Sequence, residues 1–482
     1  MENYGLALKK LIKFTKSKSK YIAAYIGYDV SYISKWSHGS KLPSSRAIER
    51  INDDLGAYFA AAIMRQETFT DCCTAFSLET TPDELPSALS QYLSNAYRAS
   101  LQQKQQPMAE TKSAVRIITG QHNMAQFFAD TIEPQLHSQT KPQEWLISSE
   151  FCTLYDANFW GFMDKAAPTA PVSIHVGLDM VRLQREPQYI TYLYRILNAH
   201  LSWEFTFYNI EEMDDAHIIV VKDMFALHYG LMKGQSFLFC TYIDSLPAVQ
   251  SLYEKVSLPK TTLHPLMAPL ASPWNTGTSR TSFYTTRDFF FFLTNGIEYL
   301  LPSSVFQDIM AHGPAEKIFA IERLRITWAE LLDKAHIDMV VPTSSLLRYI
   351  ESGHIDLTEI QYTMSPAERL AHIDSALAII KKNPAITIGL LDMTSNELDA
   401  GELNISFYSN MRTGFFKKNP LYTPEGLQPF YGILNDMLHQ LMLRHFQQLK
   451  DSPQYYHYTE PELEEKYTQY KPLVEKLLAI HQ

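Results

Sequence analysis

The chain has few cysteines and none of the spacings that usually hold a metal ion. Its 482 residues include four cysteines: Cys72 and Cys73 are adjacent, while Cys152 and Cys240 stand alone in apolar surroundings. So few thiols do not make a disulfide framework in a chain of this length. Neither Cys-x-x-Cys nor His-x-x-x-His occurs, so no structural zinc site is expected. We interpret the thiols as small buried hydrophobic side chains.

Long apolar segments and common catalytic signatures are also absent. The most apolar run, residues 288–301, contains Asn295 and Glu298 and is shorter than the roughly 20 residues of a membrane-spanning helix. The sequence lacks Gly-x-Ser-x-Gly, Gly-x-x-x-x-Gly-Lys and Gly-x-Gly-x-x-Gly. We therefore expect no catalytic residue, cofactor, metal or membrane partner. No signal peptide opens the chain, so a cytoplasmic location is expected.

The residues that are present are typical of a folded protein. Hydrophobic residues make up 46% of the chain and aromatic residues 12%. A chain of this length and composition can bury more than one core. We predict a multidomain protein, with an all-α head followed by a larger α/β body whose mixed sheets are flanked by helices.

Residues 27–43, GYDVSYISKWSHGSKLP, carry the most informative pattern. Gly27 is expected to end one helix in the left-handed conformation. Asp29 is expected to cap the next helix by accepting a hydrogen bond from the amide of Tyr32 or its neighbour. Ile33 and Trp36, three residues apart, share the face that points to the core. This pattern predicts the turn and the second helix of a helix-turn-helix motif.

Helical patterns flank this motif on both sides. Gly39 closes its last helix and Pro43 prevents continuation, after which Ser44 is a suitable cap for a further helix. Apolar residues at helical spacing precede the motif, namely Leu6, Leu8, Leu11, Ile12 and Phe14, then Ile22, Ala23 and Ile26. Residues 4–64 resemble the phage-repressor or Cro-like (XRE-type) helix-turn-helix family. The matching positions are Ile22, Ala23, Gly27, Asp29, Ser31, Ile33, Ser34, Trp36, Gly39 and Pro43.

The resemblance implies a helix-turn-helix DNA-binding domain over residues 1–65. In that family the second helix of the motif enters the major groove of double-stranded DNA, and two copies read an inverted repeat. Ser37 departs from the pattern at a surface position where many members carry glutamate. By match to the motif, base edges would be faced by Val30, Ser31, Ser34 and Lys35, and the DNA backbone would be approached by Ser19, Lys20, Tyr32 and Lys41.

The charge of the head supports the same interpretation independently. Residues 1–65 hold eleven Lys and Arg against five Asp and Glu, a net charge of +6, whereas the remainder of the chain carries −16. A basic head on an acidic body favours phosphates at the head alone.

A predicted helical linker, residues 66–142, connects the head to the body. Leu89, Leu93, Tyr97 and Leu101 recur every four residues in it. This stripe either packs within its own chain or forms a dimerisation helix with a second copy. The C-terminal helices with Leu438, Leu441, Met442, Val474, Leu477 and Leu478 are further candidates for the homodimer interface.

Strand and helix patterns alternate over residues 143–260, which predicts an α/β domain of the sensor type. The expected strands are residues 144–149, 171–178, 203–210, 216–223, 225–231 and 236–243. Part of this domain resembles half of a phospholipase D-like domain, whose His-x-Lys-x4-Asp frame would fall on Ala216, Ile218 and Asp223, with Gly230 in the next strand. The histidine nucleophile and the phosphate-binding lysine of that family would both be missing. His217 would point to the other face of the strand.

Residues 261–482 are expected to form a second α/β and helical domain. The segments Leu178-Asp179-Met180 and Phe207-Tyr208-Asn209 are echoed by Leu391-Asp392-Met393 and Phe407-Tyr408-Ser409-Asn410. Duplication and chance explain this echo equally well. Asp179 and Asp392 either line a ligand crevice at strand ends or cap the elements that follow.

Together these features predict a sequence-specific transcriptional regulator whose body senses a small-molecule or peptide effector or joins two chains. One alternative is a prophage-type repressor or antitoxin whose body binds a partner protein. Another is a hydrolase that uses the head for DNA targeting. The absence of a complete catalytic constellation favours a regulator that is not an enzyme.

Overall fold

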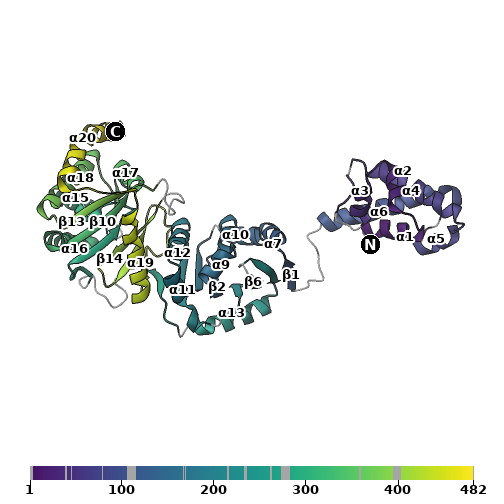
Figure 1. The fold of residues 1–482 in the computed structure, drawn as a ribbon, viewed down its shortest axis with the longest axis horizontal. Helices are drawn as coiled ribbons and strands as arrows, with labels where there is room; N and C mark the ends of the chain where they lie inside the picture. Colours follow the sequence, from purple (N-terminus) through teal and green to yellow (C-terminus); the bar gives the residue numbers. More distant parts are fainter. Residues whose placement is uncertain are drawn as a thin grey trace. The chain divides into compact units, whose positions relative to one another are not determined.

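The chain folds into two compact units, Met1–Ser113 and Ala114–Gln482, in a computed structural model (Figure 1). The structure describes residues 4–480 apart from 38–40, 45, 77, 79, 106–114, 167, 169, 214–215, 233–235, 261–262, 273–282, 358–359 and 394–402. The expectation of a multidomain chain with a large mixed sheet is met. The division lies elsewhere than expected, because the predicted linker 66–142 is shared between the two units and the predicted boundary at 260 lies within the second.

The first unit is a bundle of helices around one hydrophobic core. Its α-helices are α1 (Tyr4–Phe14), α2 (Ser19–Ile26), α3 (Val30–Ser37), α4 (Ile48–Arg65), α5 (Phe69–Phe76) and α6 (Leu85–Gln105). Residues from all six contribute to the core, including Leu8, Ile22, Trp36, Leu55, Cys72 and Leu89. The unit therefore reaches well beyond residue 65.

Helix α6 belongs to this core, so its apolar stripe packs within its own chain, which is one of the two alternatives that the sequence left open. Leu89 and Leu93 have no exposed surface, and Tyr97 is buried with them. Polar contacts fix the same helix: the Tyr97 hydroxyl donates to the carbonyl of Pro43 at 3.0 Å, and the Tyr4 amide donates to Oγ of Ser100 at 2.8 Å. The apolar residues at this spacing therefore form a face of α6 that packs within the same chain. The side chain of Leu101 lies outside the described residues.

The start of α4 differs from the sequence expectation. Ser44 does not cap the helix, because Ala47 occupies the position before Ile48 and has helical backbone angles. Oγ of Ser44 instead accepts a hydrogen bond from the amide of Arg46 at 3.3 Å. Gly39, which was expected to close α3, lies outside the described residues.

The second unit is built on one continuous mixed sheet. Its strands are β1 (Val115–Thr119), β2 (Gln143–Glu150), β3 (Val172–Leu178), β4 (Trp203–Asn209), β5 (Ile218–Val221), β6 (Phe225–Leu231), β7 (Phe237–Ile243), β8 (Met267–Leu270), β9 (Asp288–Phe292), β10 (His336–Pro342), β13 (Ile386–Leu391), β14 (Ile405–Ser409), β15 (Gly414–Lys418), β16 (Phe430–Ile433) and β17 (Tyr455–His457). A separate antiparallel ribbon joins β11 (His354–Leu357) to β12 (Ile360–Thr363). The expected strands between residues 143 and 243 correspond to β2 through β7.

The order of the strands repeats along this sheet. The first half runs β1-β7-β6-β5-β2-β3-β4 and the second runs β8-β16-β15-β14-β9-β10-β13, followed by β17. Strands β2, β3 and β4 are parallel, as are β9, β10 and β13, while the other neighbours are antiparallel. Two copies of one topology therefore follow each other in the same direction, and β4 of the first copy pairs with β8 of the second.

The sequence echo does not coincide with this repeat. Leu178 ends β3, whereas Leu391 ends β13, which corresponds to β4. Phe207 lies in β4 and Phe407 in β14, which corresponds to β5. The similar letters therefore occupy non-equivalent strands, and the repeat is one of topology.

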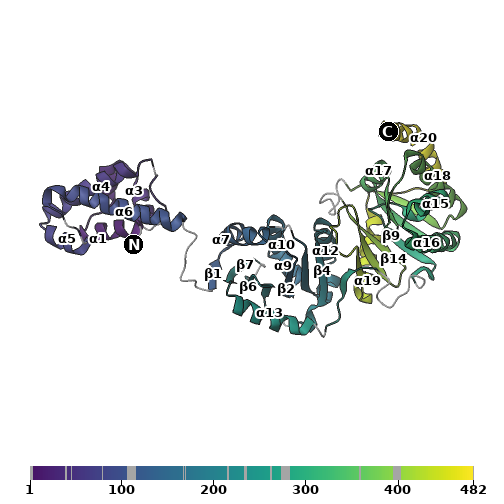
Figure 2. The same cartoon turned by 180° about the vertical axis from the view of Figure 1, so that it is seen from behind.

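Helices cover both faces of the sheet (Figures 1 and 2). They are α7 (Gln121–Phe127), α8 (Glu133–His137), α9 (Phe151–Asp156), α10 (Phe159–Lys165), α11 (Met180–Arg185), α12 (Gln188–Ala199), α13 (Leu246–Lys260), α15 (Ser303–His312), α16 (Ala315–Lys334), α17 (Thr343–Ser352), α18 (Pro366–Lys382), α19 (Asp436–Gln448) and α20 (Glu460–Ile480). Strand β9 shows why both faces are apolar: Phe290 and Phe292 pack in the core that includes α19, and Phe289 and Phe291 in the core formed with α15 to α18. The interface that was predicted at Leu438, Leu441 and Met442 is wrong, because all three are buried in α19.

Candidate functional site

The turn between α2 and α3 has the geometry that the sequence predicts. Gly27 has a φ of +73° and follows the last residue of α2, and the amide of Tyr28 donates to the carbonyl of Ala23 at 3.0 Å. Oδ1 of Asp29 accepts a hydrogen bond from the amide of Ser31 at 2.8 Å. Hydrogen bonds from Ser31, with a smaller contribution from the charge of Lys35, lower the pKa of Asp29. The carboxylate is therefore ionised at neutral pH and stabilises the first turn of α3.

The inner face of α3 is fixed by two residues. Ile33 is fully buried and Trp36 is 2% exposed. The ring of Trp36 packs edge-on against Tyr28, with 5.2 Å between ring centroids. Both anchors belong to the core that includes α1, α2, α4 and α6, so α3 is held on one side only.

The outer face of α3 carries the side chains that the sequence resemblance predicts to face DNA. Val30, Ser31, Tyr32, Ser34 and Lys35 are all exposed. Lys20 on α2 and Lys41 after α3 are exposed as well, and Ser19 is half-buried. The eight candidate residues thus lie at or near the surface, on α2, α3 and the segment that follows.

Two of the lysines lie over the ring of Tyr32. Nζ of Lys35 lies 5.9 Å from the centre of the Tyr32 ring and Nζ of Lys41 lies 5.5 Å from it. The ring itself packs against Tyr28 and Trp36. Two flexible cations over one aromatic ring form a compact positive site at the end of α3.

The net positive charge of the first unit comes from its beginning. Residues 1–41 hold eight lysines against two acidic residues, whereas residues 66–113 hold six acidic and three basic residues. Residues 66–113 therefore reduce the net charge of the whole unit from +6 to +3. The electrostatic asymmetry lies within the first unit as well as between the units.

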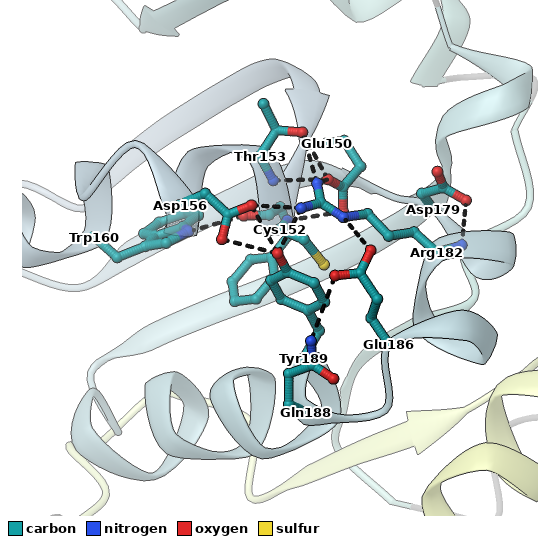
Figure 3. A network of polar contacts seen from close by, with 11 residues as sticks. Glu150, Cys152, Thr153, Asp156, Trp160, Asp179, Arg182, Glu186, Gln188 and Tyr189 are labelled. Atoms are coloured by element: carbon teal, nitrogen blue, oxygen red, sulfur yellow. Dashed lines mark hydrogen bonds and ion pairs between the residues drawn. The ribbon is translucent and has the colours of Figure 1, made fainter. Parts of the chain in front are cut away.

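In the second unit, the ends of β2 and β3 carry a dense network of polar contacts (Figure 3). The guanidinium of Arg182 contacts Glu150 at 3.0 Å and also reaches Asp156. The hydroxyl of Tyr189 donates to Oδ2 of Asp156 at 2.7 Å. Burial alone would lower the pKa of Arg182, but its carboxylate partners more than offset that effect and raise it. The network holds α9, α11 and α12 against the strand ends.

Asp179 and Cys152 have structural roles beside this network. Oδ1 of Asp179 accepts from the amide of Arg182 at 2.9 Å, so Asp179 caps α11, as one of the two sequence interpretations had it. Burial, together with Glu150, raises the pKa of the Cys152 thiol and keeps it protonated. Asp392 follows β13, and its amide donates to the carbonyl of Gln454 at 3.0 Å.

The phospholipase D-like frame falls on a small cavity in the first half of the sheet. The cavity, of about 200 Å³, is lined by Ala216 and Ile218 together with Ser148, His175 and Tyr208. Nδ1 of His175 and the Tyr208 hydroxyl are 3.3 Å apart. His217, between the two frame positions, packs its ring against Tyr229. Asp223 lies between β5 and β6 with a φ of +58°. Apolar side chains thus stand at the two positions where the predicted frame would have a histidine and a lysine.

Over the described part of the chain, no cluster of His, Cys, Asp and Glu side chains is arranged to hold a metal ion. None of the described helices is long and apolar enough to cross a bilayer. Cys72, Cys152 and Cys240 are buried free thiols.

No protein-family model matches the chain, and no curated protein sequence matches it. Solved structures show distant likenesses. TrmBL2, described as an archaeal chromatin protein with a novel mode of DNA binding, is 11% identical over 38% of this chain and 71% of its own, with a TM-score of 0.22. Phosphatidylserine synthase from Haemophilus influenzae Rd KW20 is 10% identical over 79% of this chain and 98% of its own, with a TM-score of 0.24. Likenesses this weak assign no function to this chain.

Proposed function

We propose that the chain is a sequence-specific DNA-binding transcriptional regulator of the XRE type that acts in the cytoplasm. Helices α2 and α3 would form its helix-turn-helix motif. The observation that carries the proposal is the two-sided character of α3. Ile33 and Trp36 anchor one side in the core, while the other side exposes small polar residues and a lysine beside a tight, capped turn. A helix held in this way can enter the major groove without losing its packing.

Each exposed residue takes a role from its position. Val30, Ser31, Ser34 and Lys35 would face base edges from α3, since short side chains near the start of a recognition helix allow close approach. Tyr32, Lys41, Ser19 and Lys20 would contact phosphates. The position of Lys41 over the Tyr32 ring supports a backbone contact for these two residues, because it places charge at the end of α3 without a geometry for base readout.

Two copies are expected on an inverted repeat. A single helix-turn-helix covers too few base pairs for useful discrimination in a genome, and paired recognition helices lie about 34 Å apart on DNA. The second unit would supply the homodimer contacts, through surfaces other than Leu438, Leu441 and Met442, or would respond to an effector. We infer a binding role for it instead of hydrolysis, because Ala216 and Ile218 offer neither a nucleophile nor a cation at the frame positions.

Selection from a random duplex library with the full-length protein tests this proposal. Fluorescence anisotropy on the selected duplex should show binding by the full chain and by residues 1–113, and none by residues 114–482 at physiological salt. Affinity should fall with salt with a slope of about −0.9 per phosphate contact. Lys165→Ala removes one exposed charge from α10 and should leave affinity unchanged. Failure to enrich any sequence, or enrichment by residues 114–482 alone, would refute the proposal.

A further inference from the structure

Two cavities in the second half of the sheet meet at one buried ion pair. Their volumes are about 340 and 460 Å³, within the range of small-molecule sites. Both are lined by Glu298, Asp356, Gln361, Lys417 and Pro420. They lie on the face of the sheet where Phe415 and Tyr408 pack, opposite the core that contains α19. The site is therefore distinct from the cavity at Ala216.

The ion pair is short and well shielded. Nζ of Lys417 donates to Oε1 of Glu298 at 2.9 Å and to the carbonyl of Asp356 at 3.0 Å. The side chains of Lys417 and Glu298 are 13% and 6% exposed. Burial alone would lower the pKa of Lys417, but the Glu298 carboxylate more than offsets it and raises the pKa. Lys417 thus remains charged in its buried position.

One oxygen of Glu298 is left without a hydrogen bond. Oε1 also accepts from the Tyr408 hydroxyl at 3.3 Å, whereas Oε2 is buried and has no partner among the residues that the structure describes. A buried acceptor without a donor is costly, and structures rarely keep one without a reason. A ligand that donates to Oε2 would remove this cost.

The two cavities differ in character. The larger is walled by aromatic side chains, namely Tyr284, Tyr299, Trp328, Tyr408, Phe415 and Phe430. The rings of Tyr299 and Trp328 are stacked, with centroids 4.3 Å apart. The smaller is walled by polar residues, including Asn295, Ser345, Arg348 and Asn419. A ligand that fits both must combine a flat ring with a polar group.

We propose that the joined cavities bind a nucleoside whose base has a lactam edge, a ring N–H beside a C=O, as in inosine and guanosine. The ring N–H would donate to Oε2 of Glu298. Nζ of Lys417 has three protons and donates two of them, to Glu298 and to the Asp356 carbonyl. The third would be donated to the neighbouring C=O of the base. The base would lie in the aromatic cavity and the ribose hydroxyls in the polar one. Such a nucleoside would be the effector of the proposed regulator; only that last step rests on the proposed function.

Calorimetric titration of inosine into the full-length protein tests the site without DNA. Binding of one inosine per chain is expected. 1-Methylinosine, in which a methyl group replaces the donated proton, should bind at least tenfold more weakly, because it leaves Oε2 unpaired. Equal binding of inosine and 1-methylinosine, no binding of inosine at millimolar concentration, or binding of glucose in its place would overturn the inference.

Variants provide a second arm. In Glu298→Gln, the amide oxygen must still accept from Lys417, so its NH2 group would face the base N–H, and inosine affinity should fall at least tenfold. Glu330→Gln makes the same change at an exposed position of α16 and should have no effect. Thermal melting checks that each variant folds; should Glu298→Gln unfold, the pair of inosine and 1-methylinosine decides alone. Loss of inosine binding in a variant that still binds the selected duplex separates failure of this site from failure of the DNA-binding proposal.

Discussion

Gly56 in α4 lies so close to Pro86 in α6 that a Cβ atom at residue 56 would stand 2.4 Å from the Pro86 carbonyl oxygen. The same atom would be 3.0 Å from the amide nitrogen of Ser90. Backbone atoms cannot rotate away as a side-chain tip can. The contact therefore requires glycine, and it shows how tightly α6 is docked.

Gly56→Ala should for this reason destabilise the first unit. Overpacking of a close helix contact costs about 1–3 kcal/mol, whereas helix propensity alone would favour alanine by about 1 kcal/mol. The two effects have opposite signs. Urea unfolding of residues 1–113 should show a lower free energy of unfolding for the variant, and an increase would contradict the close contact.

Truncation should distinguish the unit seen in the structure from the shorter one that the sequence predicted. Residues 1–65 lack Leu89, Leu93 and Tyr97, so the core side of α4 would be exposed to water. We expect residues 1–113 to give a cooperative thermal transition by circular dichroism and residues 1–65 to give none. A cooperatively folded 1–65 fragment would show that α6 is dispensable.

Two lysine substitutions should affect DNA binding differently. Lys35→Ala should cost about 1–3 kcal/mol at one or two base positions if Lys35 reads a guanine. Lys20→Ala should weaken all duplexes about equally, since a phosphate contact carries no sequence information. Anisotropy on a panel of single-base variants of the selected duplex measures both. An unchanged ranking for Lys35→Ala would make Lys35 a phosphate contact, consistent with its place over Tyr32.

Lys418 should make the stability of the second unit depend on pH. Burial lowers its pKa to about 8, an effect that the charge of Glu204 partly opposes; in the unfolded chain the pKa is about 10.4. Below pH 8 both states carry the charge, and the folded state bears the cost of burying it. Between pH 8 and 10 the folded chain releases its proton first, so the free energy of unfolding should rise with pH.

Lys418→Met removes this effect and provides the control. At pH 7 the variant should gain at most about 3 kcal/mol, since one unit of pKa corresponds to about 1.4 kcal/mol. Urea unfolding at pH 7, 8 and 9 should show the difference between the two proteins shrinking as the pH rises. A constant difference would mean that Lys418 keeps an ordinary pKa.

The sequence was sufficient to predict features that depend on residues close to each other along the chain. Ile33 and Trp36 are three residues apart and were correctly placed on one buried face. The strands from residue 143 to 243 were recognised because runs of β-branched and aromatic residues alternate with polar turns. Asp29 was correctly identified as a cap because its hydrogen bond joins residues two apart.

Relationships across long stretches of chain could not be inferred in this way. A stripe at every fourth residue is the same whether it packs on α4 or on a second chain, so the role of Leu89 and Leu93 stayed open. Glu298 and Lys417 are 119 residues apart, and no local pattern in the sequence pairs them. The correspondence of β2 and β9 in the repeated topology depends on the order of strands in the sheet, which the amino-acid sequence does not show directly.

The short strand β17 has a consequence for how chains avoid one another. On β13 it occupies the edge that β8 occupies on the corresponding strand β4, and it pairs antiparallel as β8 does. Gly389 makes room for the ring of Tyr455, since a Cβ there would lie 2.0 Å from its hydroxyl. Without β17, the edge of β13 would be open to a strand from another molecule, in the same way that β4 pairs with β8 within the chain. Because such a contact is head-to-tail and does not close, it would grow into filaments. The three residues of β17 thus cover part of the β13 edge with a segment of its own chain.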